Sequence, residues 1–253
     1  MGWMGKILGG GIGAVIGGPI GAIIGASLGH AVVDSRKAGA SPLSGQPAPE
    51  EDVLSASYFA CFFTCLGKMA KADGRVTQDE VETINQIIET KMRLPREDRA
   101  FAVEIFRAGR DTPRATAEFL SQFNDLTGSN PQLREFFLWS LFAVALADKN
   151  LHPAEKSILI EAERILQQPA GTVEAWLRNE QADTGGLDEA YRLLDSSPSM
   201  AMDEIKSRYR KKCLEFHPDK IQAKGLPGEF MDFANQQLTK INRAYELIRK
   251  NRG

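Results

Sequence analysis

The pattern of hydrophobic and polar positions divides the chain into three parts. No charged residue occurs from Ile7 to Val33, whereas the rest of the chain mixes charged and apolar positions. From about residue 52 onwards, apolar positions recur every three or four residues, which is the spacing of amphipathic helices. No stretch alternates long enough to indicate a strand. The pattern therefore predicts an all-α protein with an apolar N-terminal helix and two helical domains.

Two polar segments mark the boundaries between these parts. Residues 34–51 are rich in Ala, Gly, Ser and Pro, a composition typical of linkers. Residues 181–186 form a second, short linker that ends in two glycines. The predicted units are therefore an N-terminal anchor, a middle domain of about seven helices and a C-terminal unit, at residues 1–33, 52–180 and 187–253.

The N-terminal part is a repeat of four-residue units that starts at Leu8. The first position of each unit is Leu or Ile, and the second is always glycine: Gly9, Gly13, Gly17, Gly21, Gly25 and Gly29. The 27 uncharged residues exceed the roughly 20 that a helix needs to cross a bilayer. In lipid the backbone must form its hydrogen bonds internally, which enforces a helix despite the glycines. We expect a transmembrane helix in contact with membrane lipid, with Pro19 near its middle.

The glycine column of this helix favours self-association. A four-residue step turns a helix by about 400°, so the glycines form a shallow groove beside a ridge of Ile and Leu. Such faces let two backbones approach closely. The sequence predicts a homodimer through this helix, and glycines that pack only against lipid are the alternative. A cleaved signal peptide fits less well because the apolar stretch is too long, and a soluble oligomer of glycine-rich helices is the third interpretation.

Composition narrows the class of protein. The chain has 253 residues, of which 43% are hydrophobic and 25% charged, as in a soluble globular protein. Its net charge of −2 indicates no nucleic-acid partner. The cysteines Cys61, Cys65 and Cys213 form no Cys-x-x-Cys pair, which favours reduced thiols. Cys61 and Cys65 share one helix face, where they are expected to pack in the core.

The middle domain contains an internal repeat. Residues 70–80, AKADGRVTQDE, match residues 145–155, ALADKNLHPAE, at an offset of 75. Each copy places an aspartate before a turn and a glutamate after it. Oxygen ligands of this kind suit a divalent cation such as calcium or magnesium, and the candidate ligands are Asp73, Glu80, Asp148 and Glu155. The alternative is structural, because Glu80 and Glu155 stand where helix-capping glutamates are found.

The C-terminal unit is predicted to be a helical hairpin with a stiff turn. A short helix in LDEAYRLLD precedes two longer helices, at about 203–216 and 227–250. The loop between the long helices carries His217, Pro218 and Asp219. Pro218 fixes its own φ and restricts the residue before it, so the turn presents His217 and Asp219 rigidly. The apolar stripe of the first long helix consists of Ile205, Tyr209, Cys213 and Phe216. The predicted inner side of the second long helix consists of Phe230, Phe233, Leu238, Ile241, Tyr245 and Ile248.

This turn suits docking to another protein better than catalysis. A nucleophilic site needs Ser or Cys activated by His and a carboxylate, and His217 and Asp219 are too close in the chain to form that relay. A metal site needs more His, Cys or acidic neighbours. The preceding helix has five basic residues and no acid between Lys206 and Lys212. This run is either a solvated face or a docking surface for an acidic partner, and the sequence indicates no enzyme.

The middle domain resembles a known family through its repeat. ADGRVTQDE and its echo ADKNLHPAE are similar to the TerB-like fold, an all-helical pseudo-repeat named from tellurite-resistance proteins. The resemblance implies that acidic residues at these turns bind metal in some members. The second copy departs from the first by having Lys149 in place of Gly74.

The C-terminal unit resembles a J domain, the signature of DnaJ-type co-chaperones. AYRLLD, IKSRYRKKCLEFHPDK and INRAYELI occur in the order and spacing of that domain. The resemblance implies binding of a DnaK-type chaperone and stimulation of its ATP hydrolysis. His217, Pro218 and Asp219 are then the essential trio, and the helix contacts are Lys206, Arg210 and Lys211.

The order of the three parts is similar to that of membrane-anchored DnaJ-like co-chaperones of Gram-negative bacteria. This resemblance implies a single-pass protein of the inner membrane with the bulk of the chain in the cytoplasm. The charges at Lys6, Arg36 and Lys37 do not fix the orientation by themselves. The zinc-binding region of DnaJ is missing, so client selection falls to another part of the chain. The alternative function is a stress-response or metal-binding protein in which the J domain is auxiliary.

Overall fold

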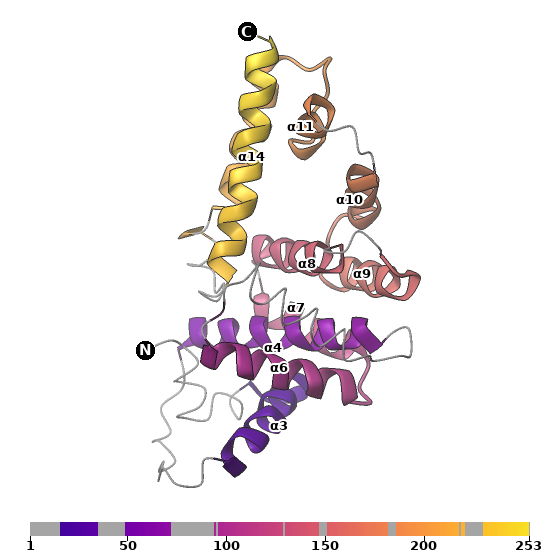
Figure 1. Ribbon diagram of the computed structural model, residues 1–253, viewed down its shortest axis with the longest axis vertical. Coiled ribbons are helices and arrows are strands. Elements are labelled where there is room, and N and C mark those ends of the chain that lie inside the picture. Colours follow the sequence, from indigo (N-terminus) through magenta and orange to yellow (C-terminus); the bar gives the residue numbers. More distant parts are fainter. Residues whose placement is uncertain are drawn as a thin grey trace.

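The protein is all-α in the part that the computed structural model describes, namely residues 16–34, 49–71, 94, 96–128, 130–146, 151–181, 186–217, 219–220 and 230–252. Every regular element in these ranges is a helix (Figure 1), which confirms the predicted fold class. The apolar spacing in residues 81–89, VETINQIIE, predicts a further helix of the middle domain, and this segment lies outside the described residues. The helices are α3 (Gly18–Asp34), α4 (Glu50–Lys71), α6 (Arg96–Asp111), α7 (Thr116–Thr127), α8 (Pro131–Ala145), α9 (Pro153–Ile165), α10 (Thr172–Gln181), α11 (Leu187–Leu193), α12 (Met202–Glu215) and α14 (Met231–Arg252).

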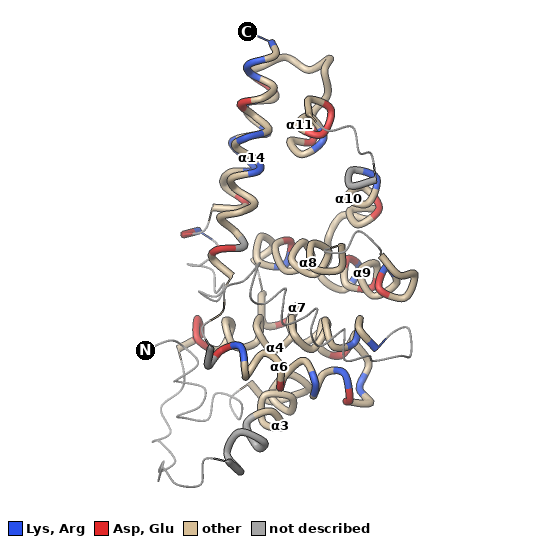
Figure 2. Tube along the Cα trace, viewed as in Figure 1, with Lys and Arg blue, Asp and Glu red and all other residues tan. Residues whose placement is uncertain are grey.

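Helix α4 is the core of the middle bundle, which consists of α4 and α6 to α10. Acidic residues occupy its first turn and Lys68 and Lys71 its last, as the helix dipole favours. The run from Ala56 to Gly67 is buried, and Figure 2 shows the uncharged centre of the helix. By length and composition α4 is the one helix among the described residues that could cross a membrane, but 72% of its apolar window is buried inside the protein. Its apolarity is therefore that of a core helix.

Two glycines let α4 and α6 pack at close range. A Cβ atom added to Gly67 would lie 2.3 Å from the carbonyl oxygen of Phe106. One added to Gly109 would lie 2.6 Å from the Cα atom of Thr64. A side chain at either glycine would therefore push the two helices apart. Cys61 and Cys65, which lie one turn apart on α4, are buried free thiols, as predicted.

Side-chain caps begin two further helices of the middle bundle. Asn130 accepts a hydrogen bond from the Leu133 amide at 3.3 Å, and Pro131 follows as the first residue of α8. Helix α9 begins in a similar way at His152 and Pro153. Buried phenylalanines from α4, α6, α7 and α8 fill the space between the helices. The caps fix where each helix starts, and the aromatic core fixes how the helices pack.

The apolar N-terminal segment is interrupted in the structure. Gly17 and Gly18 have φ angles of +57° and +58°, a left-handed conformation that glycine adopts without strain. Helix α3 then begins at Gly18, with Pro19 in its first turn, where a missing N–H is tolerated. The helix predicted over this apolar segment, with Pro19 near its middle, therefore has a break just before Pro19, because Gly-Gly-Pro favours a new helix start. Residues 1–15 lie outside the described residues.

Helix α3 packs against α4, α6 and α7 of the middle bundle (Figure 1). The Gln122 side chain of α7 holds its start, accepting a hydrogen bond from the Ile20 amide at 2.8 Å and donating to the carbonyl oxygens of Ile16 and Gly17. The sequence predicts that lipid surrounds the isoleucine ridge. In the structure, the described part of this ridge packs against protein instead. The buried side chains are Ile16, Ile20, Ile23, Ile24 and Ser27.

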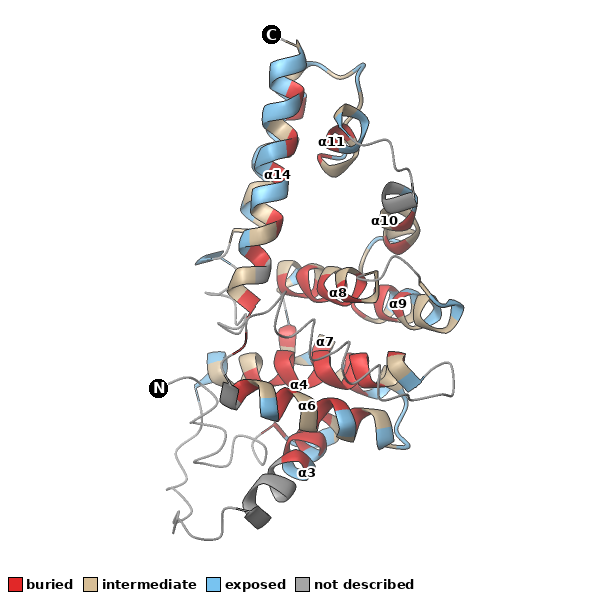
Figure 3. Cartoon of the chain, viewed as in Figure 1, coloured by how far each residue is buried: buried red, intermediate tan, exposed pale blue. Residues whose placement is uncertain are grey.

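The C-terminal hairpin consists of α11, α12 and α14. Helix α14 packs against both other helices, and Figure 3 shows that its buried positions lie on the side towards α11. Ile205 of α12 is fully buried, and Tyr209 stacks on Tyr245 with ring centres 4.1 Å apart and planes 10° apart. Phe230, the residue before α14, contacts α4 of the middle bundle.

Candidate partner-binding site

The turn that follows α12 holds its residues at different depths. His217 is half-buried, and its carbonyl oxygen accepts a hydrogen bond from the Lys220 amide at 3.0 Å, which closes the turn. Asp219 and Lys220 are exposed. Pro218 and residues 221–229 lie outside the described residues. The turn therefore offers a carboxylate to solvent beside a partly enclosed histidine.

The basic run of α12 leaves two cations available on one face. Lys206 and Arg210 are exposed and form no ion pair with the described residues. They are four residues apart, so they project from the same side of the helix. This face can meet an acidic partner. The other three cations form ion pairs within the hairpin: Arg208 with Glu204 at 3.2 Å, Lys211 with Glu215 at 3.6 Å and Lys212 with Asp195 at 2.8 Å.

One residue of the predicted apolar stripe of α12 packs outside the hairpin. Tyr209 and Cys213 contact α14, where Asn242 accepts a hydrogen bond from the Tyr209 hydroxyl at 3.0 Å. Phe216 instead packs on α8, with its ring centre 5.8 Å from that of Trp139. The stripe is therefore shared between two partners rather than facing α14 alone.

Phe230, predicted on the inner side of the hairpin, also packs on the middle bundle. It is fully buried, with its ring centre 4.7 Å from that of Tyr58 and 4.9 Å from that of Phe62. Sequence reasoning missed the role of these partners and of Trp139. The available signal was the density of aromatic residues in YFACFF and REFFLWSLF, but periodicity cannot tell which domain an aromatic residue contacts.

Of the four carboxylates predicted to bind a cation, Glu155 is described. Its carboxylate accepts a hydrogen bond from the His152 amide at 2.9 Å, and the His152 side chain accepts one from the Ala154 amide. Glu155 thus caps α9. Asp73, Glu80 and Asp148 lie outside the described residues, so the cation site stays a prediction. In the described part of the chain, no three His, Cys, Asp or Glu side chains are grouped to hold a metal ion.

The six glycines of the repeat have different surroundings. Gly17 and Gly25 are exposed, and a Cβ added at either would meet no atom within 4 Å. Gly21 is buried and Gly29 lies within α3. Gly9 and Gly13 lie outside the described residues. Self-association through this column stays a prediction.

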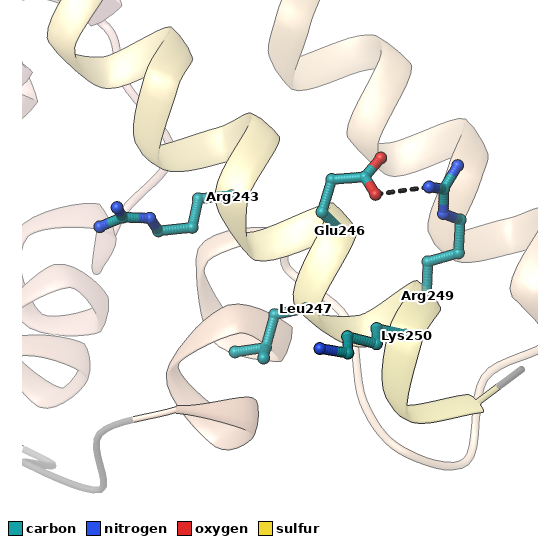
Figure 4. Close-up of a pocket in the computed structure, with 5 residues that line it drawn as sticks. All are labelled: Arg243, Glu246, Leu247, Arg249 and Lys250. Carbon is teal, nitrogen blue, oxygen red and sulfur yellow. Dashed lines mark ion pairs between the residues drawn. The ribbon is translucent and has the colours of Figure 1, made fainter.

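An open surface depression of about 440 Å³ lies along the exposed side of α14 (Figure 4). The described residues of its lining come from one helix and include no His, Cys or Ser. Catalytic and ligand sites are usually concave pockets in which several polar groups converge, so this depression has the features of a plain helix surface. It is lined by Arg243, Glu246, Leu247, Arg249 and Lys250, and an ion pair of 2.6 Å joins Arg249 to Glu246.

Two long helices joined by a His-Pro-Asp turn, with a basic face on the helix before the turn, define a J domain. A family model described as the DnaJ domain matches residues 189–252. The model of the tellurite resistance protein TerB matches residues 60–176, and that of the co-chaperone DjlA transmembrane domain matches residues 1–40. The protein is therefore a membrane-anchored co-chaperone with a TerB-type middle domain.

The chain belongs to the DjlA family of co-chaperones. It is 35% identical to Co-chaperone protein DjlA of Aliivibrio fischeri and 34% identical to that of Vibrio cholerae, in both cases over 98% of each chain. It is 32% identical to Co-chaperone protein DjlA of Escherichia coli over 78% of this chain and 80% of that one. No solved structure matches it significantly.

Proposed function

We propose that this protein recruits a DnaK-type chaperone to the membrane and stimulates its ATP hydrolysis through the turn at His217, Pro218 and Asp219. The observation that carries this proposal is the exposed pair Lys206 and Arg210, which lies on the helix that leads into the turn and has no ion pair among the described residues. Lys211 extends the same basic surface, although it also pairs with Glu215. An acidic surface on the chaperone would complement these charges.

The protein acts in this proposal as a regulator and not as an enzyme. The ATP hydrolysis belongs to the partner, and the chain supplies a docking surface without a cofactor. The capping role of Glu155 supports a structural use of at least one repeat carboxylate. The alternative, a stress-response or metal-binding protein with an auxiliary J domain, has no observation among the described residues in its favour.

The proposed arrangement is a single-pass protein of the bacterial inner membrane. Residues 1–33 form the anchor, and its insertion into lipid requires α3 to leave the middle bundle. Residues 34–51 and 181–186 are linkers, and residues 52–180 and 187–253 are the two domains. The J domain then lies in the cytoplasm, where a chaperone that uses ATP works. Two anchors associate through their glycine columns, with Gly25 exposed for such a contact.

The test is stimulation of DnaK ATPase by the full-length protein in detergent. His217→Gln and Asp219→Asn each remove one group of the turn and should abolish stimulation, while thermal unfolding stays close to that of the wild type. Asp188→Asn, at an exposed position of α11, is the matched control and should stimulate normally. Full stimulation by a folded His217→Gln protein would refute the proposed function.

A further inference from the structure

The partner-binding turn is held to the middle bundle at both of its ends. Phe216 directly precedes His217 and is 7% exposed, and Phe230 closes the loop on the other side and is fully buried. Phe216 packs on α8, and Phe230 packs on α4. The J domain therefore meets the middle bundle at the very end that the chaperone must reach.

The surface that receives these two rings is itself fixed. Tyr58 is buried, and its hydroxyl lies 3.2 Å from that of Ser140, which links α4 to α8. Phe136 and Trp139 on α8 contact each other with ring centres 5.6 Å apart, and both contact Phe216. Trp139 is only half-buried, so it lies at the margin of this aromatic surface. Removing its ring would weaken the contact without hollowing out the core.

One atom of the histidine of the turn is in an unfavourable environment. The Nδ1 atom of His217 is buried and has no hydrogen-bond partner among the described residues. A buried polar atom without a partner costs free energy, and an atom closed to solvent is closed to a partner protein as well. Asp219, Lys206 and Arg210 remain exposed. The chaperone can therefore meet the basic face first, whereas the Nδ1 atom of His217 is closed to it in this arrangement.

The charges at this contact also favour a reversible association. Glu135 on α8 is half-buried beside the end of α12, where Glu215 carries a like charge. Lys211 and Lys212 offset part of this repulsion. Interfaces between domains of one chain commonly resemble transient protein–protein contacts. The short chain between α10 and α11 keeps an undocked J domain close to the middle bundle. The contact therefore holds the J domain on the middle bundle reversibly.

We propose that Trp139 is a positioning residue of the co-chaperone, which holds Phe216 and thereby keeps the His217 end of the J domain docked on the middle bundle until the chaperone binds. This inference rests on the proposed function and adds a control step to it: the His217 end of the J domain leaves the middle bundle when the chaperone binds. When only a fraction of the J domains is undocked, the apparent dissociation constant for the chaperone is raised by the inverse of that fraction. The middle domain then sets the sensitivity of the J domain to its partner.

The first test compares two tryptophans. Trp139 contacts Phe216 of the J domain, whereas Trp176 contacts Phe142 inside the middle bundle at 5.2 Å, and both are half-buried. Trp139→Ala should lower the concentration of full-length protein that gives half-maximal ATPase stimulation by about two- to tenfold, with an unchanged maximum. Trp176→Ala should leave that concentration unchanged. Trp139→Phe keeps an aromatic ring against Phe216 and should give the same concentration as the wild type. An equal or higher concentration for folded Trp139→Ala would overturn the inference.

The second test keeps the Trp139 ring in place and does not depend on how Trp139→Ala folds. In a full-length protein with Trp3→Phe and Trp176→Phe, Trp139 is the single tryptophan. Adding ATP-loaded DnaK should shift its emission to longer wavelength as Phe216 leaves, and His217→Gln in the same background should abolish the shift. Stimulation of ATPase without any shift would overturn this inference alone, whereas absence of stimulation by the wild type would overturn the proposed function.

Discussion

The guanidinium group of Arg252 lies 5.3 Å from the ring centre of Tyr191, and its Nε atom donates a hydrogen bond to the Tyr191 hydroxyl at 2.7 Å. The same side chain donates to the carbonyl oxygen of Met200 at 2.6 Å and to that of Pro198. One cation at the end of α14 therefore holds α11 and the α11–α12 loop together. The J domain is closed in this way at the end opposite to its partner-binding turn.

Replacing Arg252 by Gln should loosen the J domain. The change removes charge-assisted hydrogen bonds to several acceptors, and the expected loss in free energy of unfolding is about 1–3 kcal/mol. Urea unfolding of the full chain measures it. Arg249→Gln removes an exposed ion pair with Glu246 and should cost less than about 1 kcal/mol. Equal losses in free energy of unfolding for both variants would show that the contacts of Arg252 do not hold the J domain together.

Reversing the charges of Lys206 and Arg210 to Glu should weaken DnaK binding by about tenfold or more, because exposed complementary charges steer association. Wild-type affinity should fall with added salt, since the screening length is about 10 Å at 0.1 M. The double variant Arg164→Glu/Arg178→Glu changes the net charge equally at exposed positions of the middle bundle and should bind normally. Affinity that does not change with salt would indicate an apolar docking surface instead.

Glu135→Gln should change the pH dependence of stability. Burial, and then the nearby Glu215, raise the pKa of Glu135 above its ordinary value of 4.5. The folded protein therefore binds this proton more tightly than the unfolded chain, and its contribution to stability is present below about pH 4.5 and lost as the pH rises through the folded-state pKa. The amide introduced by Glu135→Gln cannot titrate, so the melting temperature of the variant relative to the wild type should increase over that range.

Melting curves from acidic to neutral pH measure this effect. Glu189→Gln, at an exposed position of α11, is the control and should leave the pH profile unchanged. A constant difference between Glu135→Gln and the wild type at all pH values would contradict the predicted pKa shift.

Glu155→Ala should lower the free energy of unfolding by about 0.5–2 kcal/mol, because the His152 amide at the start of α9 loses its partner. The cation hypothesis makes the additional prediction that calcium raises the wild-type melting temperature by mass action. Calorimetry with and without calcium separates the two roles. If the loss in Glu155→Ala is the same in both conditions, the glutamate acts only as a cap.

Gly25→Leu should weaken self-association of the anchor while leaving the packing of α3 intact. Gly25 is exposed with open space around it, so leucine adds bulk to the glycine column without a clash in the bundle. Gly21 is buried, so Gly21→Leu should also lower the melting temperature. Crosslinking of the full-length protein in membranes measures association. Unchanged crosslinking in Gly25→Leu would exclude the glycine column as the contact face.

The sequence alone determined the local features of this protein. Helix starts follow from Asn130-Pro131 and from His152-Pro153 with Glu155, and the position of the His-Pro-Asp turn follows from the helices on either side of it. These features depend on groups within one or two helical turns of each other, so a linear pattern contains them. The anchor, the two domains and the family resemblances could be recognised from such patterns.

Only the tertiary structure decided which partner each apolar side chain meets. Phe216 and Phe230 have the spacing of hairpin core residues but pack on the middle bundle, and the isoleucines of α3 pack on protein where the sequence indicates lipid. The physical reason is that the hydrophobic effect is non-directional, so burial against any apolar surface is equally favourable. Periodicity shows that a side chain must be buried, and only the assembled fold selects the surface that buries it.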